Sequence, residues 1–284
     1  MLVLNDGNPL VHIRRAWVNL GLIVLMVIAY LAQEAGLFNW QVYAFFPTQT
    51  FSLSDEPGPG YGMIGLVSHI FLHGNWLHLI GNIVALWVFG DNIEDALGHV
   101  RYVLFVILTS AAAALTQGFF AYPYAMIGAS GLVSAAMGAY LLLHPRARIL
   151  ILAFNVVPIL VPASIVVGLD LVLNAAMAWD AVFVGGPEQA GIAWFAHLGG
   201  FLSGMLLVVI LRSRDVRLFQ PAPAIASRSM RWLGRFIPTI VWPGDRPVAD
   251  DMKGGTVVRR EGWTVVGKAL IYVVLIFLLM RYFG

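Results

Sequence analysis

Residues 128–143 read GASGLVSAAMGAYLLL, a serine set among small residues at the start of an apolar segment. Gly128 and Gly131 let the backbone turn tightly and let another segment approach closely. A hydroxyl group on Ser130 would lie in the first turn of a helix, where backbone N–H groups without a helical partner stabilise negative charge. The stretch is therefore typical of a nucleophile with an oxyanion site, and equally of a tightly packed membrane helix.

The composition indicates a membrane protein. Of the 284 residues, 60% are apolar and 11% charged, and the mean hydropathy of +0.81 is typical of a chain that crosses the membrane several times. The absence of cysteine excludes a thiol nucleophile, disulfides and zinc sites built on sulfur. The first apolar run is too long for a signal-peptide core, so we expect no cleavable signal peptide. The net charge of +2 predicts no nucleic-acid partner.

Apolar segments able to span, or nearly span, about 30 Å of hydrocarbon cover residues 16–33, 64–89, 101–119, 130–143, 162–179, 193–211 and 264–283. The sequence therefore predicts an all-α polytopic membrane helix bundle. We expect a six-helix core in 1–212, a basic linker in 213–262 and a C-terminal transmembrane helix in 263–284. The apolar run 149–161 leads into the fifth helix, with Pro162 expected in the first turn of that helix.

The basic residues predict how the chain is oriented. If the N-terminus is cytoplasmic, Arg281 alone among the 17 basic residues lies outside. This asymmetry follows the positive-inside rule and predicts an inside N-terminus and an outside C-terminus. Because the N-terminus does not resemble a transit peptide, we expect a bacterial inner membrane rather than an organelle.

Ionisable groups inside a span are costly and are candidates for function. They are His69, His73, His78 and Asn82 in the second segment, Asp170 and Asn174 in the fifth, and His197 in the sixth. Counting about 1.5 Å per residue from the nearest inner charge places Ser130, His78 and His197 at similar heights, about 20–24 Å above the inner side. Asp170 lies only about 12 Å up its helix, which is too deep to join them easily.

The short fourth helix constrains the loop before it. Since this helix begins at Ser130 and spans only part of the bilayer, residues 120–129 must dip into the membrane. Non-helical backbone at that depth is tolerated where protein or water covers it, which predicts a water-accessible cavity open to the outside. Gly200 and Gly204 form a small-xxx-small pair that lets the sixth helix pack on the fourth and brings His197 to Ser130.

These motifs resemble the rhomboid family of intramembrane serine proteases. The resemblance rests on Gly128-Ala129-Ser130-Gly131, on His69-x-x-x-His73-x-x-x-x-His78-x-x-x-Asn82, on Gly90-x-x-x-Glu94-x-x-x-Gly98 and on Ala196-His197-x-x-Gly200-x-x-x-Gly204. The motifs occur in the family's order on helices two, four and six, and cover about residues 16–212. The added C-terminal helix resembles the six-plus-one arrangement of some members.

The resemblance implies a role for each residue. Ser130 would be the nucleophile and His197 the general base, and His78 and Asn82 would form the oxyanion site together with the Ser130 N–H. No carboxylate at the right height orients His197, so we expect a dyad. Many members carry a tyrosine where this chain has Ser134, and many carry an arginine in the first outer loop, which has none here. We interpret Glu94 as structural.

The resulting prediction is an intramembrane serine endopeptidase that cleaves transmembrane segments of other proteins near the outer face, with membrane lipids as its surroundings and no cofactor. Two alternatives stay open. One is a non-catalytic rhomboid-like chaperone or binder of membrane proteins. The other is a transporter with Asp170 and the histidines as a proton relay, although the chain shows no internal repeat.

The remaining polar residues have less specific interpretations. His69 and His73 are spaced to share a helical face, but no His-Glu-x-x-His pattern or third ligand indicates zinc. We expect these two histidines to form hydrogen bonds with the first outer loop. We expect Asp170 and Asn174 to form a polar contact within the fifth helix.

Overall fold

A computed structural model describes residues 2–6, 8–51, 63–121, 124–153, 157–185 and 192–221 of the chain. The predicted seventh helix, nearly all of the predicted linker and part of the first outer loop lie outside these residues. The chain divides into two compact units. A helical unit comprises residues 10–143 and 167–219, and a second unit contains a small sheet formed within residues 1–9 and 144–166.

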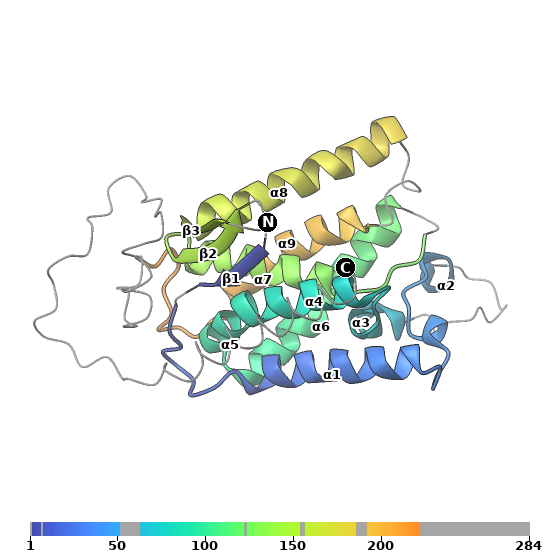
Figure 1. Ribbon diagram of the computed structural model, residues 1–284, viewed down its shortest axis with the longest axis horizontal. Coiled ribbons are helices and arrows are strands. Elements are labelled where there is room, and N and C mark those ends of the chain that lie inside the picture. The colour runs from blue at the N-terminus through green and yellow to red at the C-terminus, as the bar shows by residue number, and fades with distance from the viewer. Residues whose placement is uncertain are drawn as a thin grey trace, which may run out of the picture. The chain divides into compact units, whose positions relative to one another are not determined.

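The helices confirm a polytopic membrane bundle. In the part of the chain that is described, five helical stretches are long and apolar enough to cross a membrane. Three of them are single helices, namely α1 (Trp17–Glu34), α6 (His99–Phe120) and α9 (Trp194–Leu211). Another is the continuous run of α4 (Trp76–Ala85), the π-helical turn η3 (Leu86–Gly90) and α5 (Asp91–Leu97). The last is α8 (Ala163–Asp180), which continues into the π-helical turn η4 (Ala181–Gly185). In Figure 1, α1 and α8 lie at opposite edges of the view, with α7 and α9 between them.

Shorter elements connect these helices. The apolar helix α7 (Ser130–Leu143) has only 14 residues and begins at the serine, as predicted. The others are single turns, namely η1 (Trp40–Val42), α2 (Pro47–Phe51), α3 (Gly65–Ser68) and η2 (His69–Phe71).

The second apolar segment is not one helix, which corrects the prediction for 64–89. The chain leaves helical geometry after η2, and α4 begins only at Trp76, with the Asn75 side chain accepting a hydrogen bond from the His78 N–H at 2.8 Å. Asparagine is among the best N-cap residues, because its side chain satisfies an N–H that the first helical turn leaves free. His69 and His73 therefore do not share a helical face, whereas His78 and Asn82 both lie on α4.

The run 149–161 is also different from the prediction. It forms a β-hairpin of β2 (Arg148–Ala153) and β3 (Val157–Pro162), and β1 (Leu2–Asn5) pairs antiparallel with β2, giving the order β1-β2-β3. The register pairs Arg148 with Pro162 and Leu152 with Pro158. Pro162 thus ends a strand and is not in the helix. Proline has no N–H to donate to a neighbouring strand. This is tolerated in β3 because β3 is an edge strand, with a paired strand on one side only.

The packing of α9 on α7 is the closest helix contact in the helical unit. A Cβ atom at Gly200 would collide with the carbonyl oxygen of Gly131, and one at Gly204 with that of Ala135. Without side chains at these positions, the backbone of α9 lies directly on the backbone of α7, as the small-xxx-small spacing predicted. Every residue of α7 from Gly131 to Tyr140 is buried.

Glu94 fastens the start of α1. Its two carboxylate oxygens accept hydrogen bonds from the Val18 N–H at 3.0 Å and the Asn19 N–H at 2.7 Å, and Oε1 also contacts Nδ1 of His99. The N-cap residue of α1 makes no side-chain hydrogen bond of its own. A buried carboxylate from α5 thus caps the first turn of α1, where negative charge is favourable. This agrees with the structural role expected for Glu94.

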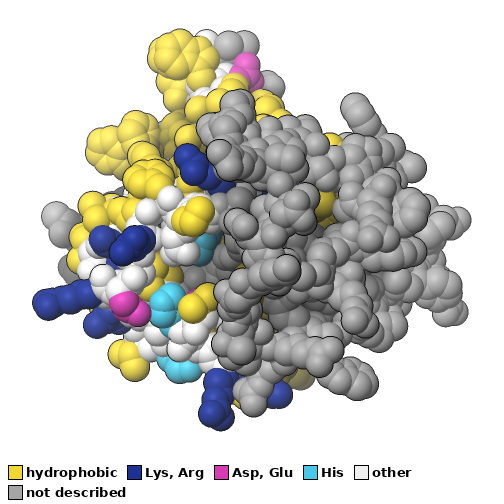
Figure 2. Space-filling view, turned by 90° about the vertical axis from the view of Figure 1, so that its left-hand side faces the viewer, with side chains coloured by type: hydrophobic (Ala, Val, Ile, Leu, Met, Phe, Trp, Pro, Cys, Tyr) yellow, Lys and Arg dark blue, Asp and Glu magenta, His cyan; other side chains and the backbone are white. Residues whose placement is uncertain are grey.

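Described arginines of the helical unit lie at the end opposite to the candidate site. Arg101, in the first turn of α6, donates a hydrogen bond to the Leu211 carbonyl at the end of α9. Glu94 likewise joins the end of α5 to the start of α1. Figure 2 views this end and shows arginine side chains gathered on it. Since α9 and the continuous run of α4, η3 and α5 end here, and α7 follows α6 after a loop, the first turns of α4, α7 and α9 lie at the other end.

Replacing Gly204 should weaken the bundle. Gly204→Ala places a methyl group against the Ala135 carbonyl, so we expect a loss of about 1–3 kcal/mol in the free energy of unfolding, measured by SDS titration in mixed micelles. Gly21→Ala is the control, because a Cβ atom there meets nothing within 4 Å. Equal stability of the two variants would contradict the close packing of α9 on α7.

Removing the charge of Glu94 should loosen the start of α1. In Glu94→Gln the amide NH₂ cannot accept one of the two backbone hydrogen bonds, and we expect a cost of about 1–3 kcal/mol. Hydrogen exchange at the first turn of α1 should rise in parallel. Glu34→Gln, at the exposed last residue of α1, should change neither quantity. Unchanged exchange at Val18 and Asn19 in Glu94→Gln would show that the cap is dispensable.

Candidate functional site

The chain before α4 is held by α1. The Gln33 side chain donates to the His73 carbonyl at 2.7 Å and accepts from the His73 N–H at 3.3 Å. With Asn75 capping α4, this fixes where the helix begins and hence where His78 lies. Asn82 follows one turn later and is buried, and among the described residues its Nδ2 has no hydrogen-bond partner. The helix therefore presents an imidazole and a free amide donor in successive turns on one face.

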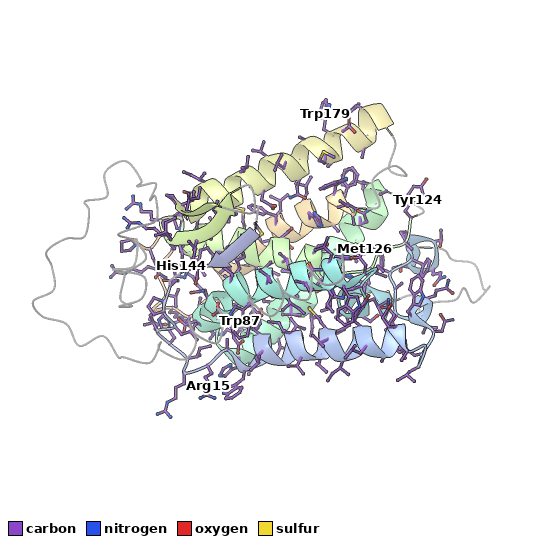
Figure 3. The ribbon with its side chains drawn as sticks, in the orientation of Figure 1. Arg15, Trp87, Tyr124, Met126, His144 and Trp179 are labelled. Carbon is purple, nitrogen blue, oxygen red and sulfur yellow. The ribbon has the colours of Figure 1, made fainter. Side chains whose placement is uncertain are left out.

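The loop before Ser130 is held by His69 and by the first outer loop. Gly128 has φ +109°, a conformation that favours glycine. Its N–H donates to the His69 carbonyl at 2.9 Å, and its carbonyl lies 3.1 Å from His69 Nδ1. Phe45 of the first outer loop and Met126 exchange two backbone hydrogen bonds. In Figure 3 the buried Met126 lies within the helical unit, whereas Arg15 points away from that unit. The prediction that the His69 ring bonds the first outer loop is therefore wrong.

The same loop lies directly against His78. A Cβ atom at Gly128 would lie 2.5 Å from Cε1 and 2.6 Å from Nε2 of the His78 ring. The imidazole from α4 thus covers the backbone two residues before Ser130. His78, a predicted site residue on α4, is thus placed beside the loop that leads into α7.

The first turn of α7 lies against the turn of α9 that carries His197. A Cβ atom at Gly131 would be 3.3 Å from the Ala196 carbonyl oxygen, and one at Gly200 would collide with the Gly131 carbonyl. Ser130 and His197 therefore belong to two turns in direct backbone contact. This close approach was predicted from the glycine spacing.

His197 is oriented by its neighbours. Its Nδ1 lies 2.6 Å from Oδ1 of Asn174, and its ring packs edge-on against Trp194, with 5.8 Å between the ring centroids. The other ring nitrogen, Nε2, is buried and has no hydrogen-bond partner within the described part of the chain. Nδ1 is thus held by Asn174, and Nε2 is left to accept a proton.

The structure revises the role expected for Asp170 and Asn174. Asn174 Nδ2 donates to the Asp170 carbonyl at 2.8 Å and to its Oδ2 at 3.0 Å, which is the contact predicted within the helix. Asn174 also reaches His197, which the sequence analysis missed. The missed signal was the spacing, because four residues raise Asn174 about 6 Å above Asp170 and bring it toward the level of His197.

The remaining histidine of the second segment packs among aromatic rings. His73 lies edge-on to His78 with 5.1 Å between the centroids and edge-on to Tyr30 at 6.4 Å. Its ring nitrogens are buried without a hydrogen-bond partner among the described residues. His69 instead places its ring nitrogens near two backbone carbonyls, those of Gly128 and Ser110. No group of three or more metal-binding side chains occurs in the described parts of the chain.

Comparison with known proteins identifies relatives of this chain. The chain is 28% identical over 149 residues to mitochondrial rhomboid protein 1 of Saccharomyces cerevisiae, covering 50% of this chain and 40% of that protein. It is 29% identical over 121 residues to rhomboid protease GlpG of Haemophilus influenzae, covering 43% and 59%. It is 27% identical over 193 residues to the mitochondrial RHOMBOID-like protein 12 of Arabidopsis thaliana, covering 60% and 57%.

The chain spans about half the length of these relatives. A family model described as the Rhomboid domain matches residues 61–214, a range that begins before α3 and ends just after α9. All of the candidate residues, from His69 to His197, fall inside it. The chain therefore belongs to the rhomboid family.

Proposed function

We propose that this protein is an intramembrane serine endopeptidase with Ser130 as nucleophile and His197 as general base. The observation that carries the proposal is the contact between the first turn of α7 and the turn of α9 around His197, combined with the unpartnered Nε2 of that histidine. A serine and an available imidazole nitrogen on two backbones in contact are the parts that acyl transfer requires. The rhomboid protease GlpG among its relatives supports the same reaction class.

The reaction follows from these two groups. The Ser130 Oγ attacks the carbonyl carbon of a peptide bond while His197 Nε2 takes the hydroxyl proton. The C–N bond then breaks, and the same nitrogen gives that proton to the leaving amine, so that an acyl-enzyme remains on Ser130. A water molecule then attacks the acyl carbon while His197 Nε2 takes one of its protons. The bond between the acyl carbon and Ser130 Oγ breaks, Nε2 returns the proton to that oxygen, and the carboxyl product leaves.

The negative charge of the tetrahedral intermediate needs donors. Asn82 Nδ2 is buried and, in the described residues, unpaired, and His78 lies against Gly128, two residues before the nucleophile. The Ser130 N–H is one of the N–H groups that the first turn of α7 leaves free. Together these groups form an oxyanion site of preorganised donors, usually the largest electrostatic contribution to such catalysis.

The substrates we infer are transmembrane segments of other membrane proteins. The site lies at the end of the helical unit opposite to the basic residues, so a cytoplasmic basic end puts the chemistry near the outer face of the membrane. In this orientation the N-terminus is cytoplasmic and the C-terminus outside. Membrane lipids would surround the exposed apolar helix faces, and we place the protein in a bacterial inner membrane.

The serine is tested with a covalent probe. A fluorophosphonate should label the purified full chain in detergent micelles, with no labelling of Ser130→Ala and at least about 100-fold slower labelling of His197→Ala. Ser134→Ala is the matched control, because it removes a buried serine one turn further along α7 and should label normally. Labelling of Ser130→Ala at the wild-type rate, or none of the wild type, would overturn the assignment. The latter result would favour a non-catalytic binder of membrane proteins.

The oxyanion site is tested by the rate of the same labelling. Asn82→Ala should slow the inactivation step about 100-fold at saturating probe, because a donor to the developing charge is lost, with little change in probe affinity. His78→Phe should behave similarly. Asn92→Ala removes a buried amide from the same helical run at the opposite end, and should leave the rate unchanged. An equal rate for Asn82→Ala and Asn92→Ala would exclude Asn82 from the oxyanion site.

A further inference from the structure

The polar contacts of His197 extend into a neighbouring helix. Its Nδ1 meets Oδ1 of Asn174 on α8 at 2.6 Å. Asn174 in turn uses its Nδ2 on the backbone carbonyl and the carboxylate of Asp170, at 2.8 and 3.0 Å. The three side chains form one continuous chain of hydrogen bonds across two helices. Hydrogen bonds in a row of this kind strengthen one another in a medium of low dielectric constant.

The orientation of the Asn174 amide decides where the proton of His197 lies. A backbone carbonyl can only accept, so the NH₂ group of Asn174 must face Asp170, and its oxygen must face His197. An amide oxygen is an acceptor, so the Nδ1 of His197 must carry a hydrogen. In a neutral imidazole the other nitrogen is then bare. Nε2, the buried nitrogen without a partner among the described residues, is therefore the basic one.

We propose that Asn174, held by Asp170, is the positioning residue that fixes His197 in the tautomer with a bare Nε2. The proposal rests on the role of His197 as general base. It adds Asn174 and Asp170 of α8 to the site, with the amide of Asn174 in the place where a triad has a carboxylate in direct contact with the histidine. Asp170 acts through Asn174 by keeping its amide from rotating. Without this chain, the proton of the neutral imidazole can move to Nε2, and such a histidine cannot take the serine proton.

The arrangement also ties the chemistry to the placement of α8. Ala178 of α8 and Phe195 of α9 also belong to one cluster of buried apolar side chains. Trp179 instead points away from the bundle and is 65% exposed (Figure 3). Since Asn174 comes from a different helix than His197, the histidine keeps its tautomer only while α8 stays against α9.

The tautomer is measured directly by nitrogen NMR. The full chain, labelled with ¹⁵N-histidine in detergent micelles, is recorded at pH 8, where an ordinary histidine with a pKa of about 6.5 is neutral. The His197 signals are identified by their loss in His197→Gln. We expect the proton on Nδ1 in the wild type, and a mixture of both tautomers in Asn174→Leu. A wild-type proton on Nε2, or the same tautomer in both proteins, overturns the proposal.

Labelling kinetics supply the functional readout. Asn174→Leu should slow fluorophosphonate inactivation by roughly 10- to 100-fold with little change in probe affinity, whereas Leu173→Ala, on the exposed side of α8, should match the wild type. Asn174→Asp alone places two carboxylates one turn apart and should also be slow. The exchange Asp170→Asn with Asn174→Asp keeps an acceptor for Nδ1 and replaces the second carboxylate with an amide that can donate to the first, so it should recover most of the rate.

The two experiments separate this inference from the proposed function. If the wild type carries the Nδ1 proton and Asn174→Leu does not, but no fluorophosphonate labelling occurs, the positioning of His197 stands and the protease assignment fails. If the wild type is labelled and the exchange variant is no faster than Asn174→Asp, the positioning role fails and the protease assignment stands.

Discussion

The contact of the α9 backbone with the α7 backbone is the constraint on which the rest of the site depends. Gly200 and Gly204 leave no side chain between α9 and the carbonyl oxygens of Gly131 and Ala135. In a membrane, helices gain little from burying apolar surface, so such close van der Waals packing is a main source of their association. This packing sets the turn of His197 against the first turn of α7.

Polar contacts then fix the position of segments that the packing of α9 on α7 does not determine. His69 holds the backbone at Gly128, and Gln33 and Asn75 hold the start of α4. At the opposite end, Glu94 caps α1. These bonds end on backbone groups that have no helical partner, in non-helical segments or in the first turn of a helix, and in hydrocarbon such groups must find partners inside the protein. The described backbone at Gly128 and at His73 is therefore tied to the helical unit by hydrogen bonds.

The sequence predicted the bundle well and its irregular parts poorly. Long apolar runs identify spans because length and hydropathy are properties of the segment alone. The break before Trp76 was missed because the flanking residues are apolar on both sides, and only the capping by Asn75 reveals the new helix. The hairpin of β2 and β3 was missed because a short apolar run has no periodicity that separates strand from helix. The strand β1, from the N-terminus, pairs with β2 and completes the sheet, and this pairing is not visible in the run itself.

For the site, the sequence by itself determined which residues are candidates and at what height most of them lie. Ser130, His78 and His197 follow from motif spacing and from about 1.5 Å of rise per residue, and the close approach of two helices follows from glycine spacing. Only the tertiary structure decided which partners these residues meet. The bond from Asn174 to His197 depends on how α8 is rotated and placed against α9. That placement arises from side-chain packing between distant segments, and no local pattern in the sequence records it.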